Sequence, residues 1–578
     1  MHTPTVHRYP RGFSGTPSSL EHDEYLDDPP TLKLAQFFQN KGLAALKEED
    51  RREQWYDDWI AYQAEHRIYA SVLSPRQHST SGNHFDLLRY ARFLEVFAYF
   101  SPAHGYSAQV TFLGLFAILM GGNETLKKEA VAALESGGLL AFGVSEKEHG
   151  SDLLASEFTI TPRGPGRYVA SGTKHYIGNA NAASIICILA RRADPRADER
   201  VRRVPFVLFA LRPAQSKSLR NLRKIRTLGV RGGYVGAFEV NEHELSESDF
   251  IAEGRQAWDA VLGTVTLGKF FLGFGSIGIC EHALEEARDH LRTRTLYGKP
   301  AIDMAHLRNT MAQAYARLTA MKLYAYRALE YVHAAHANDR RYLLFCAVQK
   351  ARVSTQGVKV MALLSECIAA KGFEADTYFE MALRDVQLIP SLESSAHINL
   401  GLTAQFCARY FDRFDRSLSE PASLRAGAGE NPYLTEARTG AVPAIAFPPF
   451  IRAYRSHRSI RNVRLFVHQA RRFRRFLRDN REKRNLTDVQ YSLVLGQCPA
   501  IIAYAQLIAE NARRLNVPGE MFSVIFHLLV SDFSAAALAL ASLPQLDDAS
   551  RCRVRRMVTV PQTSQAEWDF VAARMDAR

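Results

Sequence analysis

The chain has 578 residues, of which 47% are hydrophobic, with seven cysteines and a formal net charge of +13. A chain of this length and apolar content can bury a large core, and we expect it to form two to four domains. The odd number of widely scattered cysteines argues against a disulfide framework or a metal site such as zinc, and fits a reducing compartment. The first residues, MHTPTVHRYPRGFSG, lack the apolar stretch of a targeting signal, so we expect a cytoplasmic protein.

The spacing of apolar residues divides the chain into blocks. Helical spacing begins after Pro29-Pro30, as in DLLRYARFLEVFAYF. From about residue 153, short runs rich in β-branched and aromatic residues, such as VPFVLFALRP, are typical of antiparallel strands. Helical spacing returns from about 255, and again after a Gly-, Ala- and Pro-rich linker. We therefore predict a mainly α protein with a central antiparallel β-domain, arranged as a polar tail (1–30), an N-terminal helical domain (31–138), the β-domain (139–250), a helical bundle (251–424), a linker (425–450) and a C-terminal helical extension (451–578).

A polar knot lies where the first helical domain meets the β-domain. The stretch LLAFGVSEKEHGSDLLASEFTI (139–160) places hydroxyls, glycines and charges between two apolar runs. Backbone amides around glycine, with short hydroxyls, suit the close approach of an anionic or heteroaromatic ligand. Taken alone, such a loop is more often only a turn.

Four further motifs follow this stretch in order. They are GTKHYIGN (172–179), TLGVRGGYVGAFEVNE (227–242), RTLYGKP (294–300) and KGFEADTYFEMALRDVQLIPSLESSAHIN (371–399). Together the five motifs resemble the acyl-CoA dehydrogenase family of flavoproteins, in its larger type with a C-terminal helical extension. The matching residues of the first two motifs are Ala141, Phe142, Ser145, Glu146, Gly150, Ser151, Asp152, Gly172, Lys174, Tyr176, Ile177 and Asn179.

The resemblance implies a reaction and a base. Family members oxidise an acyl-CoA thioester to the 2-enoyl-CoA, with a carboxylate removing the α-proton and FAD accepting the β-hydrogen as hydride. Glu393 matches the family's catalytic glutamate by its position relative to Arg384-Asp385, and its apolar sequence neighbours suit a base of raised pKa. A minority of the family carries the base on another helix, where this chain has Gly268. The alternative is that Glu393 is only a surface glutamate in a loop.

The resemblance also implies which residues hold FAD and the substrate. For the thioester these are Ser151 and Lys269, the latter in place of an expected arginine. Family members share each FAD across a homodimer or homotetramer, so Arg294 and the turn at Gly372 would contact the FAD of a partner subunit. The implied cofactor-binding residues are Phe142, Val144, Ser145, Ser151, Tyr176, Ile177, Gly178, Arg294, Gly372, Phe373, Ser394 and Ser395.

Several cofactor positions depart from the family pattern. Gly178 stands where a threonine hydroxyl is usual beside the hydride-accepting nitrogen, and Ala369-Ala370 replaces a glycine pair. Glu366 replaces a glutamine close to the expected pyrophosphate. These departures keep three hypotheses open: a dehydrogenase that passes electrons to an electron-transfer flavoprotein, an oxidase that uses dioxygen, and a degenerate relative that binds acyl ligands or partners without turnover. Coenzyme A and an acyl-carrier protein both remain possible carriers.

Most of the net charge lies in one segment of the extension. Residues 452–484 contain twelve Arg and one Lys against two acidic residues, a net charge of +11. Leu465, Phe466, Phe473, Phe476 and Leu477 interleave with the arginines, which predicts an apolar edge beside a cationic face. Such a helix can lie on an anionic bilayer, each basic group contributing about 1 kcal/mol. The alternatives are an acidic carrier protein or a solvated helix whose arginines pair with acids elsewhere; without a recognised module, we do not expect nucleic acid.

The most apolar run of the chain, residues 523–543, contains His527 and Asp532. A carboxylate in the bilayer centre costs about 2.5–3.5 kcal/mol, so we predict a core helix rather than a membrane span.

Overall fold

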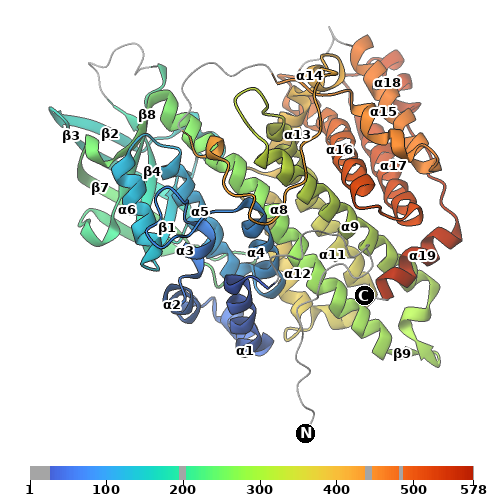
Figure 1. The fold of residues 1–578 in the computed structure, drawn as a ribbon, viewed down its shortest axis with the longest axis horizontal. Helices are drawn as coiled ribbons and strands as arrows, with labels where there is room; N and C mark the ends of the chain where they lie inside the picture. Colours follow the sequence, from blue (N-terminus) through green and yellow to red (C-terminus); the bar gives the residue numbers. More distant parts are fainter. Residues whose placement is uncertain (1–26, 194–202, 437–444, 481–485, 577–578) are drawn as a thin grey trace. The chain divides into compact units, whose positions relative to one another are not determined.

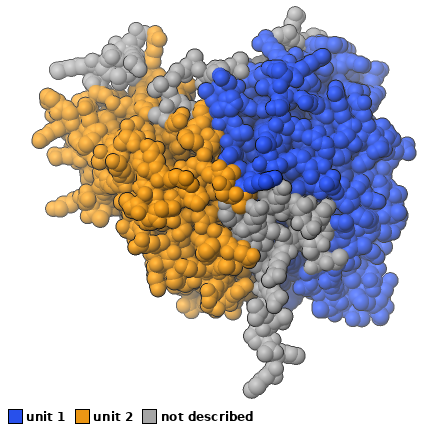
Figure 2. Space-filling view, in the orientation of Figure 1, with its two compact units in different colours: residues 1–24, 272–425, 443–578 blue, residues 25–271, 426–442 orange. Residues whose placement is uncertain are grey.

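The computed structural model describes residues 27–193, 203–436, 445–480 and 486–576. The predicted tail (1–30) therefore lies almost wholly outside the described residues, as do part of the predicted linker and Arg481, Lys483 and Arg484 of the cationic segment. The chain forms two compact units, coloured in Figure 2: unit 2 contains residues 25–271 and 426–442, and unit 1 contains most of the remainder. We describe each unit by itself.

Unit 2 begins with helices and continues into a sheet (Figure 1). The helix starts follow local rules: the Asp86 side chain accepts a hydrogen bond from the Arg89 amide, and Pro102 occupies a first-turn position where its missing N–H is not needed. The helices are α1 (Pro29–Arg52), α2 (Asp57–Glu65), α3 (Ile68–Leu73), α4 (Leu87–Phe100), α5 (Pro102–Leu119), α6 (Glu124–Glu135) and the first part of α8 (Gly254–Thr293).

The sheet has the order β6–β7–β3–β2–β4–β5–β8, and β1 pairs with β4. Its strands are β1 (Leu139–Gly143), β2 (Thr159–Gly164), β3 (Arg167–Gly178), β4 (Ala183–Arg192), β5 (Phe206–Leu211), β6 (Leu219–Lys224), β7 (Val235–Ser246) and β8 (Phe250–Glu253). We predicted an antiparallel sheet, but β1 and β2 each run parallel to β4. For β2 the reason is that β4 follows β3 in the chain but pairs on the other side of β2, and a strand that skips its antiparallel neighbour runs parallel to the next one. For β1, the polar knot provides a long connection to β2, so the two strands can run in the same direction.

Unit 1 is helical apart from one small hairpin. It contains the rest of α8, the hairpin β9 (Thr295–Leu296) and β10 (Lys299–Pro300), then α9 (Ala305–His333), α10 (Tyr342–Val348), a π-helical turn (Gln349–Val353), α11 (Ser354–Ile368), α12 (Tyr378–Leu388), α13 (Ala396–Gln405), α14 (Cys407–Phe411), α15 (Arg461–Asp479), α16 (Val489–Arg514), α17 (Gly519–Ala541), α18 (Asp548–Arg555) and α19 (Gln565–Asp576).

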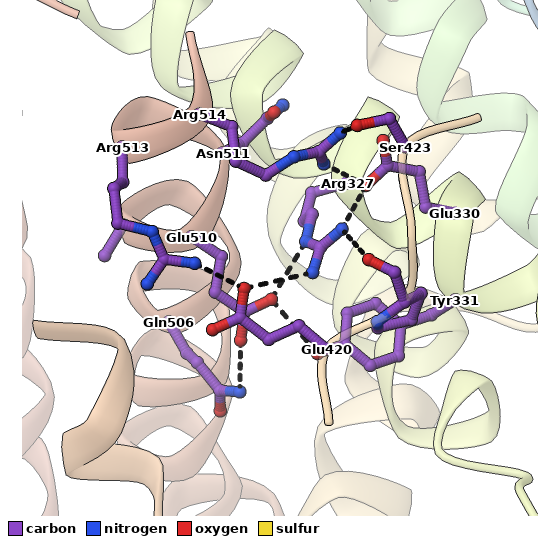
Figure 3. A network of polar contacts seen from close by, with 12 residues as sticks. Arg327, Glu330, Tyr331, Glu420, Ser423, Gln506, Glu510, Asn511, Arg513 and Arg514 are labelled. Carbon is purple, nitrogen blue, oxygen red and sulfur yellow. Dashed lines mark hydrogen bonds and ion pairs between the residues drawn. The ribbon is translucent and has the colours of Figure 1, made fainter. Parts of the chain in front are cut away.

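A buried polar network joins the extension to the bundle inside unit 1 (Figure 3). The Arg327 side chain of α9 is fully buried, and its guanidinium donates to Glu510 of α16 at 2.9 Å and to Glu330 of its own helix. Tyr331 also donates to Glu510, at 3.0 Å, and Arg514 of α16 reaches back to Glu330 at 2.5 Å. Buried charges are tolerated only when paired in this way, so the network fixes α16 against α9.

Three helices of the described chain are long and apolar enough to cross a membrane, judged by length and composition alone. They are α8, α16 and α17, and 67%, 83% and 61% of their most apolar windows is buried inside the structure. Residues 523–543, predicted as a core helix, fall largely in α17. Its Asp532 accepts hydrogen bonds from Arg352 at 2.7 Å and from Arg317 at 3.2 Å.

Candidate functional site

The polar knot forms a loop that is hydrogen-bonded to the end of strand β3. The carbonyl of Ser145 accepts from the His175 amide at 3.0 Å, and the Ser145 hydroxyl donates to the His175 carbonyl at 2.7 Å. Phe142 and Ser145 are half-buried, Val144 is buried and Ser151 is exposed. We call residues 144–158 the lip loop. The structure therefore brings the first two predicted motifs together inside unit 2.

A buried ion pair anchors the lip loop to strand β3. Lys174 is fully buried, and its Nζ contacts Glu146 Oε1 at 2.8 Å and the Val144 carbonyl at 3.0 Å. The Glu146 carboxylate also accepts from the backbone amides of Glu157 at 2.7 Å and Phe158 at 3.1 Å. Burial raises the pKa of Glu146, but the Lys174 ammonium and these hydrogen bonds outweigh it and lower that pKa to about 2.

The end of β3 turns an aromatic ring outward. Tyr176 has a left-handed φ of 63° where the register with β7 shifts, and its side chain is 58% exposed. Ile177 on its other side is buried, and the Asn179 amide donates to the carbonyls of Ser107 at 2.9 Å and Leu140 at 3.2 Å. This anchoring fixes the bend that presents Tyr176.

Sequence reasoning missed one residue at this bend, Tyr106 of α5. A Cβ built on Gly178 would lie 2.8 Å from the Tyr106 hydroxyl and 2.6 Å from the terminal methyl of Val110. A side chain at position 178 would therefore require Tyr106 and Val110 to shift. No local pattern links positions 106 and 178, because they meet only through the packing of α5 on β3.

Lys269, predicted to bind the substrate, lies on α8 in unit 2 and is only 5% exposed. Its neighbour Gly268, at the place of the alternative base, has its carbonyl bonded by the Gln109 side chain at 3.0 Å. The structure therefore encloses the Lys269 side chain rather than presenting it on the surface.

Glu393 lies on a strained turn in unit 1, between α12 and α13. Glu393 and Ser394 have left-handed φ values of 48° and 72°, which cost about 1–3 kcal/mol each for residues other than glycine. Buried Asn399 compensates, because its amide donates to the carbonyls of Ser394 at 3.3 Å and Ser395 at 2.9 Å. Buried Lys350, in the π-helical turn, donates to the Ile389 carbonyl just before Glu393. Half-buried Glu393 is thus held on a fixed turn.

Three further predicted residues of unit 1 lie after α8 and on the turn after α11. Arg294 follows α8 and is exposed, and Phe373 is 73% exposed on the turn after α11, beside buried Gly372. Burial and the nearby charges of Arg294 and Lys371 lower the pKa of His290, which places both cations near this imidazole. Arg294 and the 369–373 turn are therefore brought close together.

The site residues thus fall into two sets. Unit 2 holds Phe142, Val144, Ser145, Ser151, Tyr176, Ile177, Gly178 and Lys269, and unit 1 holds Arg294, Gly372, Phe373, Glu393, Ser394 and Ser395.

Comparisons with known proteins show which domains the chain resembles. Residues 141–242 match the family model "Acyl-CoA dehydrogenase, middle domain", and residues 256–406 match "Acyl-CoA dehydrogenase, C-terminal domain". The first match covers the sheet and the second contains the Glu393 turn. Residues 141–242 and 256–406 therefore carry the middle and C-terminal domains typical of the acyl-CoA dehydrogenase family, and the chain continues beyond them into the extension.

Individual relatives are distant. A cyclohex-1-ene-1-carbonyl-CoA dehydrogenase of Syntrophus aciditrophicus is 24% identical over 277 residues, which cover 48% of this chain and only 64% of that protein. An acyl-CoA dehydrogenase of Bacillus subtilis is 24% identical over 63% of this chain and 94% of its own length. The structure of an acyl-CoA dehydrogenase complexed with FAD from Bacillus anthracis superposes with a TM-score of 0.76 at 15% identity, covering 99% of this chain and 98% of that one. The last comparison shows that the fold, extension included, is shared.

Proposed function

We propose that this protein is an FAD-dependent acyl-CoA dehydrogenase. In the proposed reaction the substrate loses its α-proton to the Glu393 carboxylate and its β-hydrogen as hydride, and a carbon–carbon double bond forms next to the thioester. FAD, when bound, would accept that hydride. The observation that carries the proposal is the Glu393 turn, a carboxylate held in strained backbone by Asn399 within the matched C-terminal domain.

The residues present fit a flavin in two respects. Exposed Tyr176 offers an aromatic face for stacking beside the backbone and hydroxyl of Ser145, which suits a flat heteroaromatic ring. Arg294 and Lys371 gather positive charge near His290, which suits a pyrophosphate. Tyr176, Ser145 and the lip loop would therefore hold the ring of one FAD, and Arg294 with the 369–373 turn would hold the phosphates of the FAD bound by a partner subunit.

Glu393→Gln tests the base. The amide keeps the shape of the side chain and cannot take a proton, so the variant should bind FAD normally. Flavin bleaching by an acyl-CoA under anaerobic conditions should slow by at least about 100-fold, the usual contribution of a general base. Asp376→Asn, an exposed carboxylate in the same unit, is the matched control and should bleach at the wild-type rate. Equal bleaching by Glu393→Gln and wild type would show that the base lies elsewhere.

Two other functions are separated by simple measurements. An electron-transfer flavoprotein is the proposed electron acceptor, and oxygen consumption with an acyl-CoA would instead identify an oxidase. A non-catalytic relative would be colourless when purified and could not be reconstituted with FAD.

We also propose that the protein acts in the cytoplasm and associates with anionic membrane surfaces through charge alone. Of the predicted apolar edge, Phe466, Phe473, Phe476 and Leu477 are each at most 1% exposed, and Leu465 is half-buried. The predicted apolar edge is therefore not available to a bilayer, because it packs inside unit 1 on α17 and α18. What α15 exposes is a stripe of basic residues at alternating spacings of three and four: Arg461, Arg464, His468, Arg471, Arg475 and Arg478. The arginines carry its positive charge, because burial and the neighbouring arginines lower the pKa of His468.

A further inference from the structure

We propose that the Tyr106 hydroxyl supplies the hydrogen bond that a side chain at position 178 would otherwise give to the hydride-accepting nitrogen of the flavin. This inference rests on the proposed function, since it concerns the bound cofactor. It assigns a contact role to a residue on α5, outside the five sequence motifs.

The space beside Gly178 shows why the two positions act as a pair. Position 178 follows Tyr176 and Ile177 at the outward bend of β3, and its backbone pairs with Val235 of β7. The missing Cβ of Gly178 would lie 2.8 Å from the Tyr106 hydroxyl oxygen and 2.9 Å from a carbon of its ring. Real Cβ contacts are essentially never shorter than 3.0 Å, so Tyr106 fills the volume of a side chain at 178.

The same edge of the Tyr106 ring also faces Gly233, in the turn before β7. A Cβ on Gly233 would lie 3.2 Å from Cδ1 of Tyr106, the ring carbon bonded to the Cε1 that approaches Gly178. Glycine at both positions therefore leaves room for this edge of the ring. Tyr106 as a whole is partly buried.

The chemistry requires such a group. A hydride acceptor gains electron density at one nitrogen, and a donor placed there in advance stabilises the developing charge. Glycine at 178 cannot donate from a side chain, whereas a phenol hydroxyl can both donate and accept a hydrogen bond. The Tyr106 hydroxyl thus takes the place of the hydroxyl that glycine at position 178 lacks.

Tyr106→Phe removes the hydroxyl and keeps the ring in place. The variant should bind FAD about three- to ten-fold more weakly, the loss expected for one hydrogen bond, and the visible absorption bands of its bound flavin should shift. Tyr62→Phe is the matched control, because it removes a tyrosine hydroxyl in the same unit that donates to the Lys33 carbonyl and is not assigned to the flavin. It should leave both measurements at the wild-type values.

A rescue experiment separates the hydroxyl from the packing. Tyr106→Ala with Val110→Ala opens the volume beside residue 178, and Gly178→Thr added to this pair should recover the FAD affinity and the spectrum. Gly178→Val in the same background has the same shape without a hydroxyl and should not. If Tyr106→Phe matches wild type in affinity and spectrum, or if Val restores as well as Thr, the inference is wrong while the proposed function stands. If neither wild type nor any variant binds FAD, both are overturned.

Discussion

At the scale of single residues, the lip loop depends on a buried ion pair between Lys174 and Glu146. The sequence identified these two residues only as matches to a motif, whereas the structure shows that they anchor the loop. Their ion pair connects the end of β3 to both ends of the lip loop, through the Val144 carbonyl and the amides of Glu157 and Phe158. Loss of this pair would release the loop that carries Ser145 and Ser151.

The lowered pKa of Glu146 predicts an acid-sensitive contribution to stability. Because its pKa is about 2 in the folded state and 4.5 in the reference state, the folded protein binds fewer protons between these values. The stabilisation is therefore complete above about pH 4.5 and is lost as the pH falls towards 2. Thermal midpoints measured from pH 6 to 3 should fall more steeply for wild type than for Glu146→Gln. Glu148→Gln, on the same loop but with its side chain 76% exposed, should follow wild type. Parallel curves for wild type and Glu146→Gln would contradict this prediction.

The sequence predicts the place of a residue in the site where a single short motif contains that residue. The lip loop, the exposed ring of Tyr176 and the turn of Glu393 all follow from short contiguous patterns. Lys350 and Tyr106 could not be found in this way, because each acts across a distance in the sequence that only packing closes. Asn399 lies inside the fifth motif, but the motif alone did not indicate that it holds the Glu393 turn.

At the scale of elements, the periodicity of α15 predicts its two faces, but only the structure shows which face is buried. The helix was predicted correctly, and its interleaved apolar and basic residues do segregate to opposite faces. The sequence could not show that unit 1 already covers the apolar face. Among the described arginines of residues 452–480, only Arg474 and Arg478 have a carboxylate within 4.0 Å, so most of the charge is not neutralised inside the fold.

The exposed stripe predicts salt-sensitive binding to anionic vesicles. Arg471→Gln, Arg475→Gln and Arg478→Gln together remove three exposed charges while leaving the buried face unchanged. Wild type should float with phosphatidylserine–phosphatidylcholine vesicles at low salt and be released as salt is added, since each basic group near the surface contributes about 1 kcal/mol. The triple variant should bind markedly less, with turnover of a soluble acyl-CoA unchanged.

The matched control for vesicle binding removes the same charge from unit 2. Arg220→Gln, Arg223→Gln and Arg255→Gln are all exposed substitutions and should float like wild type. Equal flotation of the α15 variant, or none by wild type at low salt, would rule out this surface as a membrane contact. Binding of nucleic acid or of an acidic protein with the same dependence on α15 would identify a different partner.

At the scale of the whole molecule, the sequence predicted the succession of helical and sheet segments. It did not predict that residues 426–436, within the expected linker, belong to unit 2. The Glu430 carboxylate there accepts from the amide of Phe85 at 3.0 Å, and the Gly429 amide donates to Asp86 at 3.4 Å. A linker by composition is thus packed against a distant part of the chain, which local patterns cannot reveal.

Assembly is predicted to control cofactor retention. If each FAD is shared between two subunits, Arg294 and the 369–373 turn act on the partner's cofactor, and flavin is lost when the oligomer dissociates. Arg294→Ala should therefore weaken FAD binding about ten-fold, as expected when a charged hydrogen bond is removed, without changing the preference for acyl chains. Lys299→Ala, an exposed cation on the neighbouring hairpin strand, is the control. A monomer that keeps its flavin on dilution would contradict shared binding.

The steric conflict between a side chain at 178 and tyrosine at 106 also constrains how this sequence can change. A Cβ at 178 would press against the phenol oxygen of Tyr106 and against the terminal methyl of Val110, whereas glycine at 178 beside a smaller residue at 106 leaves only an unfilled space. Glycine at 178 therefore tolerates a change at 106 more readily than tyrosine at 106 tolerates a change at 178. Among relatives of this chain, tyrosine at the first position should occur only with glycine at the second, whereas glycine can occur without tyrosine.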